Sequence, residues 1–205
     1  MDLGNTPASL AILGCIVVVS FLALQVNTGI LERNLLRPYW VLRKKTYDTI
    51  ITCGFIHGDF GHLLFNCLTL FFFGPSLEGR IGTVKFVLLY FIGLIVSSLG
   101  TVWKRRNDPN YASLGASGAI LAVLFASIMY FPDRTLYLFF ALPIPAPLFA
   151  VGYLAYSIWA SKNSRDNINH DAHLDGALTG ILFVMVTDFQ VYSRALRAIL
   201  GAFGL

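Results

Sequence analysis

Long apolar runs separated by short polar connections organise this chain of 205 residues. No charged residue occurs between Asp2 and Glu32, and this run exceeds the roughly 20 apolar residues that a membrane-spanning helix needs. Three prolines within 143–147 interrupt a later run, and one regular helix cannot hold them. We therefore predict an apolar loop over 136–146. The predicted spans are 8–28, 62–78, 84–103, 116–131, 147–160 and 172–188.

This pattern predicts an all-α membrane protein, a single domain over residues 1–205 built as a bundle of six transmembrane helices. A cleavable signal peptide is the alternative for the first run, but no basic segment precedes it and it is long for a signal sequence. Composition agrees, because only 13% of residues are charged and the mean hydropathy is +0.68. Soluble domains carry about 25% charged residues. Lipid is the predicted solvent.

The net charge of +4 would suggest nucleic-acid binding in a soluble protein. In a membrane protein, basic residues between spans usually set topology or contact lipid head groups. The first connection mixes basic and aromatic side chains, as a segment lying at the membrane interface does: Arg33, Arg37, Tyr39, Trp40, Arg43, Lys44, Lys45 and Phe55. The lipid bilayer is therefore a predicted partner, and nucleic acid is not.

Polar residues gather where the even-numbered spans begin. All four histidines fall into two motifs, His57-Gly-Asp-Phe-Gly-His62 and His170-Asp-Ala-His173. The polar residues that open the second, fourth and sixth spans are His62, Asn66, Ser117 and His173. If spans alternate in direction, these three helices start from one side of the membrane, so the residues lie at similar depth. Ionisable residues in spans are costly, and their presence suggests function.

Small residues flank these positions and favour close helix contact: Gly115 and Gly118 beside the serine, Ala122 one turn on, and Gly176 and Gly180 after the last histidine. Contact between those faces would bring Ser117 within hydrogen-bond reach of His173, which is the geometry of an activated nucleophile. Backbone N–H groups at the helix start, with His62 and Asn66, could hold an oxyanion.

Each residue also has a structural interpretation. A serine between small residues is more often a packing site, and Asn66 alone could be an interhelical hydrogen-bonding group. Their placement on one face favours function for the set. Asp171 and Asp175 lie on other helix faces than His173, so the pair is predicted to be a dyad without a carboxylate.

The chain resembles the rhomboid family of intramembrane serine proteases, in its compact six-helix bacterial form, from about Thr46 to Gly180. The matching segments, in order, are His57 to Asn66, Phe73-Gly74 with Leu77-Glu78 and Gly82, Gly115 to Ile120, Ile144 to Pro147, and His170 to Gly180. The resemblance implies Ser117 as nucleophile, His173 as general base, and His62 and Asn66 in the oxyanion hole. It gives His57 a structural role, and implies transmembrane protein substrates that reach the serine between spans two and five.

The sequence departs from the family at two positions near the predicted site. Leu121 stands where many members have an aromatic residue packed on the catalytic histidine, and Asp175 stands where a glycine is usual. The first connection also lacks a clear Trp-Arg pair. These differences leave every predicted catalytic group in place but would alter the orientation of His173.

The distribution of basic residues and the family resemblance predict opposite orientations of the protein in the membrane. Connections one, three and five hold ten of the fifteen Lys and Arg residues, which places the predicted active-site side in the cytoplasm by the positive-inside rule. The resemblance places it outside a bacterial inner membrane. Half of those ten residues lie in the interfacial first connection, and without it the counts are equal. We follow the resemblance.

Three hypotheses follow for function. The first is an intramembrane serine endopeptidase that cleaves transmembrane segments. The second is a catalytically weak or inactive rhomboid-like protein that binds membrane clients. The third is a metal-dependent membrane enzyme or transporter built on the four histidines. His-Glu-x-x-His is absent and no histidine spacing matches a familiar zinc motif, so we predict neither metal nor cofactor.

Overall fold

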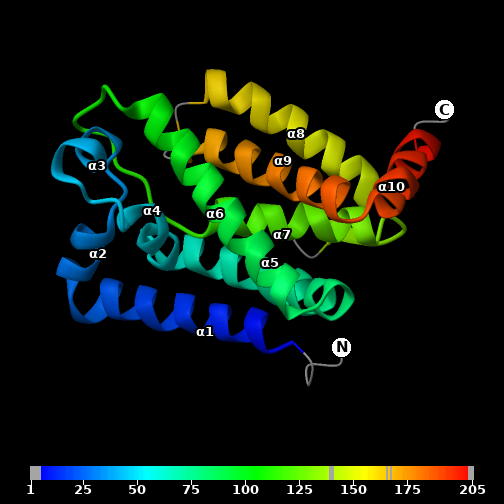
Figure 1. Ribbon diagram of the computed structural model, residues 1–205, viewed down its shortest axis with the longest axis horizontal. Helices are drawn as coiled ribbons and strands as arrows, with labels where there is room; N and C mark the ends of the chain where they lie inside the picture. The colour runs from blue at the N-terminus through cyan, green and yellow to red at the C-terminus, as the bar shows by residue number, and fades with distance from the viewer. Residues whose placement is uncertain (1–5, 139–140, 165, 167, 203–205) are drawn as a thin grey trace.

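Helices occupy all six ranges that the hydrophobic pattern predicts as spans (Figure 1). The computed structural model describes residues 6–138, 141–164, 166 and 168–202. The six helices are α1 (Pro7–Phe21), α5 (Phe60–Ile81), α6 (Thr83–Arg105), α7 (Ser117–Tyr130), α8 (Ala146–Asn163) and α9 (His170–Thr187). The ends of the predicted domain, 1–5 and 203–205, and residues 139–140 of the predicted loop lie outside the described residues.

Three of these helices are long and apolar enough to cross a membrane by length and composition: Pro7–Val26, α5 and α6. The first combines α1 with a π-helical turn, η2 (Leu22–Val26). The apolar helix α7 is shorter, with 14 residues. Several boundaries differ from the predicted ones by a few residues. For example, α5 begins at Phe60 because Asp59 caps it, its Oδ1 accepting from the backbone N–H of His62 at 2.8 Å.

The core of the molecule is α7, in which every residue from Gly118 to Tyr130 is buried. A helix that is apolar on all sides has no face suited to water and lies in a protein interior or in lipid. Here α5, α6 and α9 pack around it. Because α7 begins at Ser117, that serine stands at the end of the most enclosed helix of the protein.

The first predicted connection folds into short helices at one end of the bundle, on the left in Figure 1. They are α2 (Thr28–Asn34), α3 (Pro38–Lys44), α4 (Thr49–Thr52) and the 3₁₀ turn η3 (Cys53–Phe55). In α3, Arg43 lies over the ring of Tyr39 and Lys44 over that of Trp40. The helices α5, α7 and α9 all begin at this end (Figure 1).

The predicted apolar loop over 136–146 is wrong in form, because most of it is a β-hairpin. Strand β1 (Thr135–Leu138) pairs antiparallel with β2 (Leu142–Pro145). A two-stranded hairpin has free edges, where prolines that lack an N–H can be accommodated. The prolines that interrupt the helix therefore still permit a strand.

A further helix, α10 (Phe189–Ala202), follows α9 and lies outside the six predicted spans. Its segment is too polar for a span, since Arg194 and Arg197 are exposed. Its buried side is formed by Val191 and Ala195, one turn apart, which join the hydrophobic core. Such one-sided burial is typical of an amphipathic surface helix.

A buried carboxylate fastens α1 to α5. Glu78, on α5, is fully buried and accepts hydrogen bonds from the backbone N–H groups of Ala8 and Ser9, at 3.0 and 2.8 Å. The hydroxyl of Thr83 donates to the same carboxylate at 2.8 Å. The first N–H groups of a helix lack partners within it and carry partial positive charge, so a carboxylate is stabilised there.

Candidate functional site

The turn before α7 sets the position of Ser117. Gly115 has φ +107°, a conformation that favours glycine, and its N–H donates to the carbonyl of Cys53 at 2.9 Å. The imidazole of His62 lies directly against it, since a methyl group at position 115 would stand 2.6 Å from Cε1 of that ring. Ser117 then begins α7, where its backbone N–H has no partner in the helix ladder.

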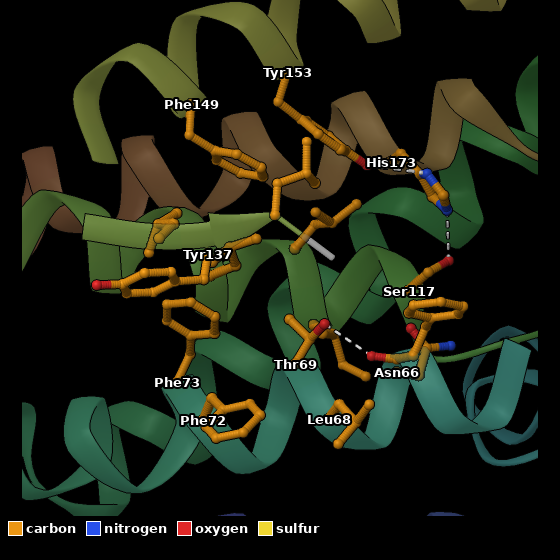
Figure 2. Close-up of a pocket in the computed structure, with 16 residues that line it drawn as sticks. Asn66, Leu68, Thr69, Phe72, Phe73, Ser117, Tyr137, Phe149, Tyr153 and His173 are labelled. Atoms are coloured by element: carbon orange, nitrogen blue, oxygen red, sulfur yellow. Dashed lines mark hydrogen bonds between the residues drawn. The ribbon is translucent and has the colours of Figure 1, made fainter. Parts of the chain in front are cut away.

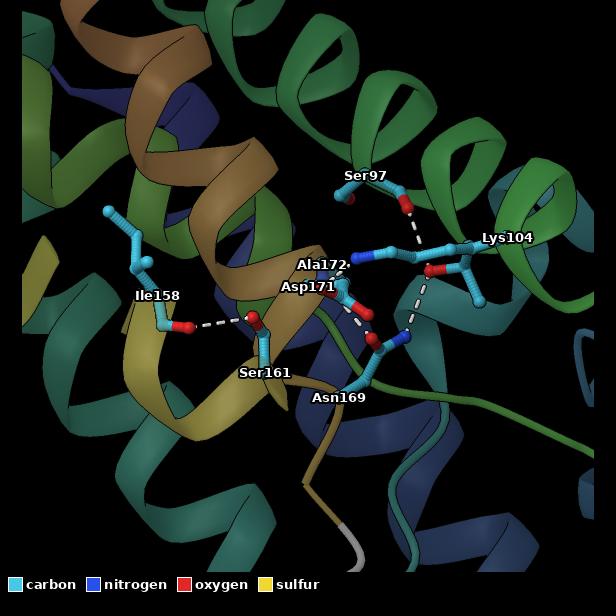
Figure 3. Close-up of polar contacts among 8 residues, drawn as sticks. Ser97, Lys104, Ile158, Ser161, Asn169, Asp171 and Ala172 are labelled. Atoms are coloured by element: carbon cyan, nitrogen blue, oxygen red, sulfur yellow. Dashed lines mark hydrogen bonds and ion pairs between the residues drawn. The ribbon is translucent and has the colours of Figure 1, made fainter. Parts of the chain in front are cut away.

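The start of α9 is anchored to α6 by polar contacts. Asn169 caps α9, with Oδ1 accepting from the N–H of Ala172 at 3.1 Å, and its Nδ2 donates to the hydroxyls of Thr101 and Ser113 at 2.8 and 3.1 Å. Figure 3 shows this cap beside an ion pair between Lys104 of α6 and Asp171 of α9. These contacts fix the first turn of α9, which carries His173.

Ser117 and His173 lie within hydrogen-bond distance, because Nε2 of the histidine is 2.9 Å from Oγ of the serine (Figure 2). At two glycines of α9 no side chain separates the helices: a methyl group at Gly176 would stand 2.1 Å from the carbonyl oxygen of Gly118, and one at Gly180 would stand 2.3 Å from that of Ala122. The small residues therefore allow the backbones of α7 and α9 to touch.

The second ring nitrogen of His173 faces a residue that sequence reasoning missed. Its Nδ1 lies 3.2 Å from Oη of Tyr153, on α8. A tyrosine in an apolar helix is common. Because Tyr153 and His173 lie on different helices, their separation of 20 residues does not predict a contact. No pattern in the sequence pointed to this contact.

Asn66 lines the same cavity as the serine and histidine and is itself held in place. Its Nδ2 donates to Nε2 of His57 at 2.8 Å, and Nδ1 of His57 lies 2.8 Å from the hydroxyl of Ser20 on α1. That hydroxyl donates to the carbonyl of Phe55 at 3.0 Å. The chain is consistent when Nδ1 carries the proton of a neutral ring. Sequence reasoning also missed Ser20.

Burial lowers the pKa of His57 to about 3, with His62 adding to the effect and Asp59 opposing it. The ring is fully buried. A neutral His57 is therefore expected across the physiological range, as its hydrogen bonds require. The ring of His62 meets that of His57 edge to face, with centroids 4.8 Å apart.

An apolar cavity of about 380 Å³ opens beside Ser117. Figure 2 shows Ser117, His173 and Asn66 at one end and Phe73, Tyr137 and Phe149 at the other. The walls come from α5 on one side and α8 on the other, with α7 between them and β1 at the far end. Leu121, one turn after Ser117, contributes to the lining. The cavity has room for apolar groups of a ligand next to the serine.

A much smaller cavity, of about 20 Å³, reaches Ser117 from the side of α6. Hydroxyl and amide side chains dominate its lining: Ser97, Ser98, Thr101, Ser113 and Asn169. A site of this size with several polar partners can hold one water molecule.

The carboxylates of Asp171 and Asp175 lie against other groups than His173. Asp171 pairs with Lys104, and Asp175 lies against Gly100 of α6. His170 does not face the serine but pairs with Asp166 at 3.1 Å. Within the described part of the chain, no group of three or more His, Cys, Asp or Glu side chains is arranged to hold a metal ion.

A helical membrane protein that carries a serine–histidine pair at one end of its bundle is the class that this fold and geometry define. The Rhomboid domain matches residues 44–188. The chain belongs to the rhomboid family.

Similar proteins occur in bacteria and mitochondria. The chain is 30% identical to "Putative rhomboid protease YdcA" of Bacillus subtilis, over 79% of this chain and 78% of that protein. It is 34% identical to "Rhomboid protein 1, mitochondrial" of Saccharomyces cerevisiae, over 70% of this chain and 44% of that protein. It is 33% identical to "RHOMBOID-like protein 12, mitochondrial" of Arabidopsis thaliana, over 63% of this chain and 43% of that protein. The chain thus spans less than half the length of the two mitochondrial relatives.

Proposed function

We propose that this protein is an intramembrane serine endopeptidase that cleaves transmembrane segments of other proteins. Membership of the rhomboid family supports action on membrane proteins. The observation that carries the proposal for this chain is the distance of 2.9 Å between Oγ of Ser117 and Nε2 of His173. A packing serine needs no such partner.

In the proposed reaction, Nε2 of His173 takes the proton of the Ser117 hydroxyl as Oγ attacks the scissile carbonyl. The same nitrogen then gives that proton to the leaving amine, and an acyl-enzyme ester remains on Ser117. Water attacks the ester with His173 again acting as base, and the free serine is restored. The polar cavity behind Ser117 is suited to hold this water.

The tetrahedral intermediate carries a negative charge on the former carbonyl oxygen. We assign its stabilisation to the N–H of Ser117 at the start of α7, together with the side chains of Asn66 and His62. The hydrogen bond from Asn66 to His57 supports this role, because it holds the amide before the charge develops. Donors fixed in advance need no reorganisation during the reaction.

The proposed substrate reaches the serine between α5 and α8. The cavity there is lined by apolar and aromatic side chains, which suits a segment taken from lipid. A peptide bond within a helix is enclosed by its own backbone, so the substrate must unwind locally. Its exposed N–H and C=O groups then need new partners, because lipid supplies none.

The proposal includes six membrane crossings by α1, α5, α6, α7, α8 and α9, in one domain over residues 1–205. It also places the protein in a bacterial cell membrane, in keeping with the match to most of the Bacillus relative. Membrane fractionation would test the location. Recovery of the protein with mitochondria instead would refute it.

The decisive experiment compares the purified protein with its Ser117→Ala variant on a transmembrane substrate in detergent or liposomes. The variant should lose cleavage completely, because no other group replaces Oγ. A fluorophosphonate probe should label the native protein and not the variant. A native protein that binds membrane clients but neither cleaves nor takes up the probe would instead be the inactive, client-binding alternative.

A further inference from the structure

His173 has two ring nitrogens with different partners, and the second has no role in the reaction described above. Nε2 meets Ser117 at 2.9 Å, while Nδ1 meets Oη of Tyr153 at 3.2 Å. We propose that Tyr153 is a positioning residue: its hydroxyl accepts the Nδ1–H of His173 and so holds the ring in the tautomer that can deprotonate Ser117. This inference rests on the proposed function.

The tautomer matters because a neutral imidazole carries one proton on one of its two nitrogens. Nε2 can accept the proton of Ser117 only if Nδ1 carries the ring proton. At this part-buried contact an Nδ1–H needs an acceptor, because leaving a donor unpaired away from water is costly. The phenolic oxygen of Tyr153 is such an acceptor, and it continues to accept when the ring becomes imidazolium during the reaction.

A carboxylate usually fills this role in serine hydrolases with three catalytic residues. Within the part of the chain that the structure describes, the aspartates close in sequence to His173 contact groups other than Nδ1. Asp166 pairs with His170, Asp171 pairs with Lys104, and Asp175 lies against Gly100. Tyr153 is thus the group that faces Nδ1.

The ring of Tyr153 is held by aromatic neighbours on two helices. It stacks on Phe149 of α8, with centroids 5.7 Å apart and planes inclined by 25°. It also contacts Phe125 of α7, at 5.7 Å. These contacts restrict the ring and therefore the place of its hydroxyl.

This arrangement explains why residue 121 need not be aromatic. It lies one turn after Ser117 and belongs to the buried cluster against which Tyr153 packs. An aromatic side chain on α7 is not what supports His173 in this protein; the aromatic support comes from α8. Figure 2 shows Tyr153 extending from α8 towards His173.

The position of Tyr153 also connects substrate binding with the chemistry. Both Phe149 and Tyr153 line the apolar cavity. A segment seated between α5 and α8 therefore touches the side chains that hold His173. Displacement of α8 away from α9 would break the hydrogen bond to Nδ1, and its return would restore the working tautomer.

The test uses Tyr153→Phe in the full-length protein, which keeps the ring and removes only the hydroxyl. We expect kcat for a transmembrane substrate to fall about tenfold with KM nearly unchanged, because one hydrogen bond contributes free energy of about this size. Tyr156→Phe is the matched control on the same helix. Tyr156 is half-exposed and faces the ring of His170, so this variant should keep the native kcat.

A second measurement does not depend on how the variant folds. In the native protein labelled with ¹⁵N-histidine, the nitrogen chemical shifts of His173 should report a proton on Nδ1. A proton on Nε2, or an unchanged kcat in a folded Tyr153→Phe protein, would overturn the inference. If the native protein takes up no serine probe, the proposed function fails instead, and the nitrogen shifts still decide whether Nδ1 of His173 carries the proton that Tyr153 would accept.

Discussion

Ser117 is distinguished by its neighbours rather than by its own side chain. Its oxygen faces a histidine whose other nitrogen is engaged by Tyr153, and its N–H opens a helix beside Asn66. A nucleophile, a base and oxyanion donors within one site are the minimum for acyl transfer. The chemistry of this site therefore depends on how well each side chain is held.

Replacement of Asn66, the proposed oxyanion donor, should show this directly. Asn66→Ala is expected to lower kcat about 100-fold, since loss of one oxyanion donor typically has an effect of this order or larger. KM should change little, because the charge that Asn66 is proposed to stabilise is absent from the bound substrate. Steady-state kinetics on a transmembrane substrate would measure both.

Thr69→Ala is the matched control for this prediction. Thr69 lies on the same helix and lines the same cavity, but its hydroxyl donates to the carbonyl of Phe65 in its own helix. Its removal should leave kcat within about twofold of the native value, because it takes no donor from the oxyanion. Equal loss in both variants would mean that Asn66 acts only through packing.

At the scale of helices, the contact between α7 and α9 decides whether the dyad exists. The backbones touch at Gly176 and Gly118, where a single methyl group would overlap a carbonyl oxygen. Backbone atoms cannot turn away as a flexible side chain can. Even a small side chain here must move α9 and, with it, His173.

Gly176→Ala should therefore reduce both activity and stability. We expect a loss of roughly 1–3 kcal/mol in the free energy of unfolding, the usual effect of overpacking, and a fall in kcat of more than tenfold, since small misplacements of reacting groups are costly. Thermal unfolding in detergent and cleavage kinetics would measure the two effects.

The matched control is Gly152→Ala on α8, where an added methyl group would have no atom within 4 Å. Alanine favours helix over glycine by about 1 kcal/mol, so this variant should be as stable as the native protein or slightly more so. If Gly176→Ala kept the native stability and kcat, α7 and α9 could move apart without disturbing the contact between Ser117 and His173.

Helix faces also explain how much of the site could be predicted. Ser117, His173 and Asn66 stand out because polar groups in apolar spans are rare, and the small residues near them mark the helix contact. Tyr153 could not be found in this way. A tyrosine is ordinary in an apolar helix, and its approach to His173 depends on the register between α8 and α9, which local sequence does not specify. The hairpin was missed because prolines indicate only where a helix cannot continue.

At the scale of the whole molecule, stability should depend on pH through His57. Burial lowers the pKa of His57 from its ordinary value of 6.5 to about 3, so between these values the unfolded chain binds a proton that the folded protein does not. The free energy of unfolding should therefore be highest above pH 6.5 and decrease steadily as the pH falls towards 3. Thermal unfolding in detergent at several pH values would measure this.

A His57→Gln variant isolates the contribution of this one group. Glutamine does not titrate, so its stability should fall less steeply between pH 6.5 and 3, even if the variant is less stable at neutral pH. Parallel curves for the two proteins would show that His57 is not the titrating group.

The shortness of α7 determines the depth of Ser117 in the proposed topology. Its 14 residues extend about 21 Å, whereas the hydrocarbon layer is about 30 Å thick. The chain beyond its far end soon exposes Asp133 and Arg134, so in the proposed topology that end lies at a bilayer boundary. With α7 upright, Ser117 then lies about 9 Å beneath the opposite boundary, a depth of about six helical residues. In the proposed reaction, peptide bonds would therefore be selected by their depth below the membrane surface.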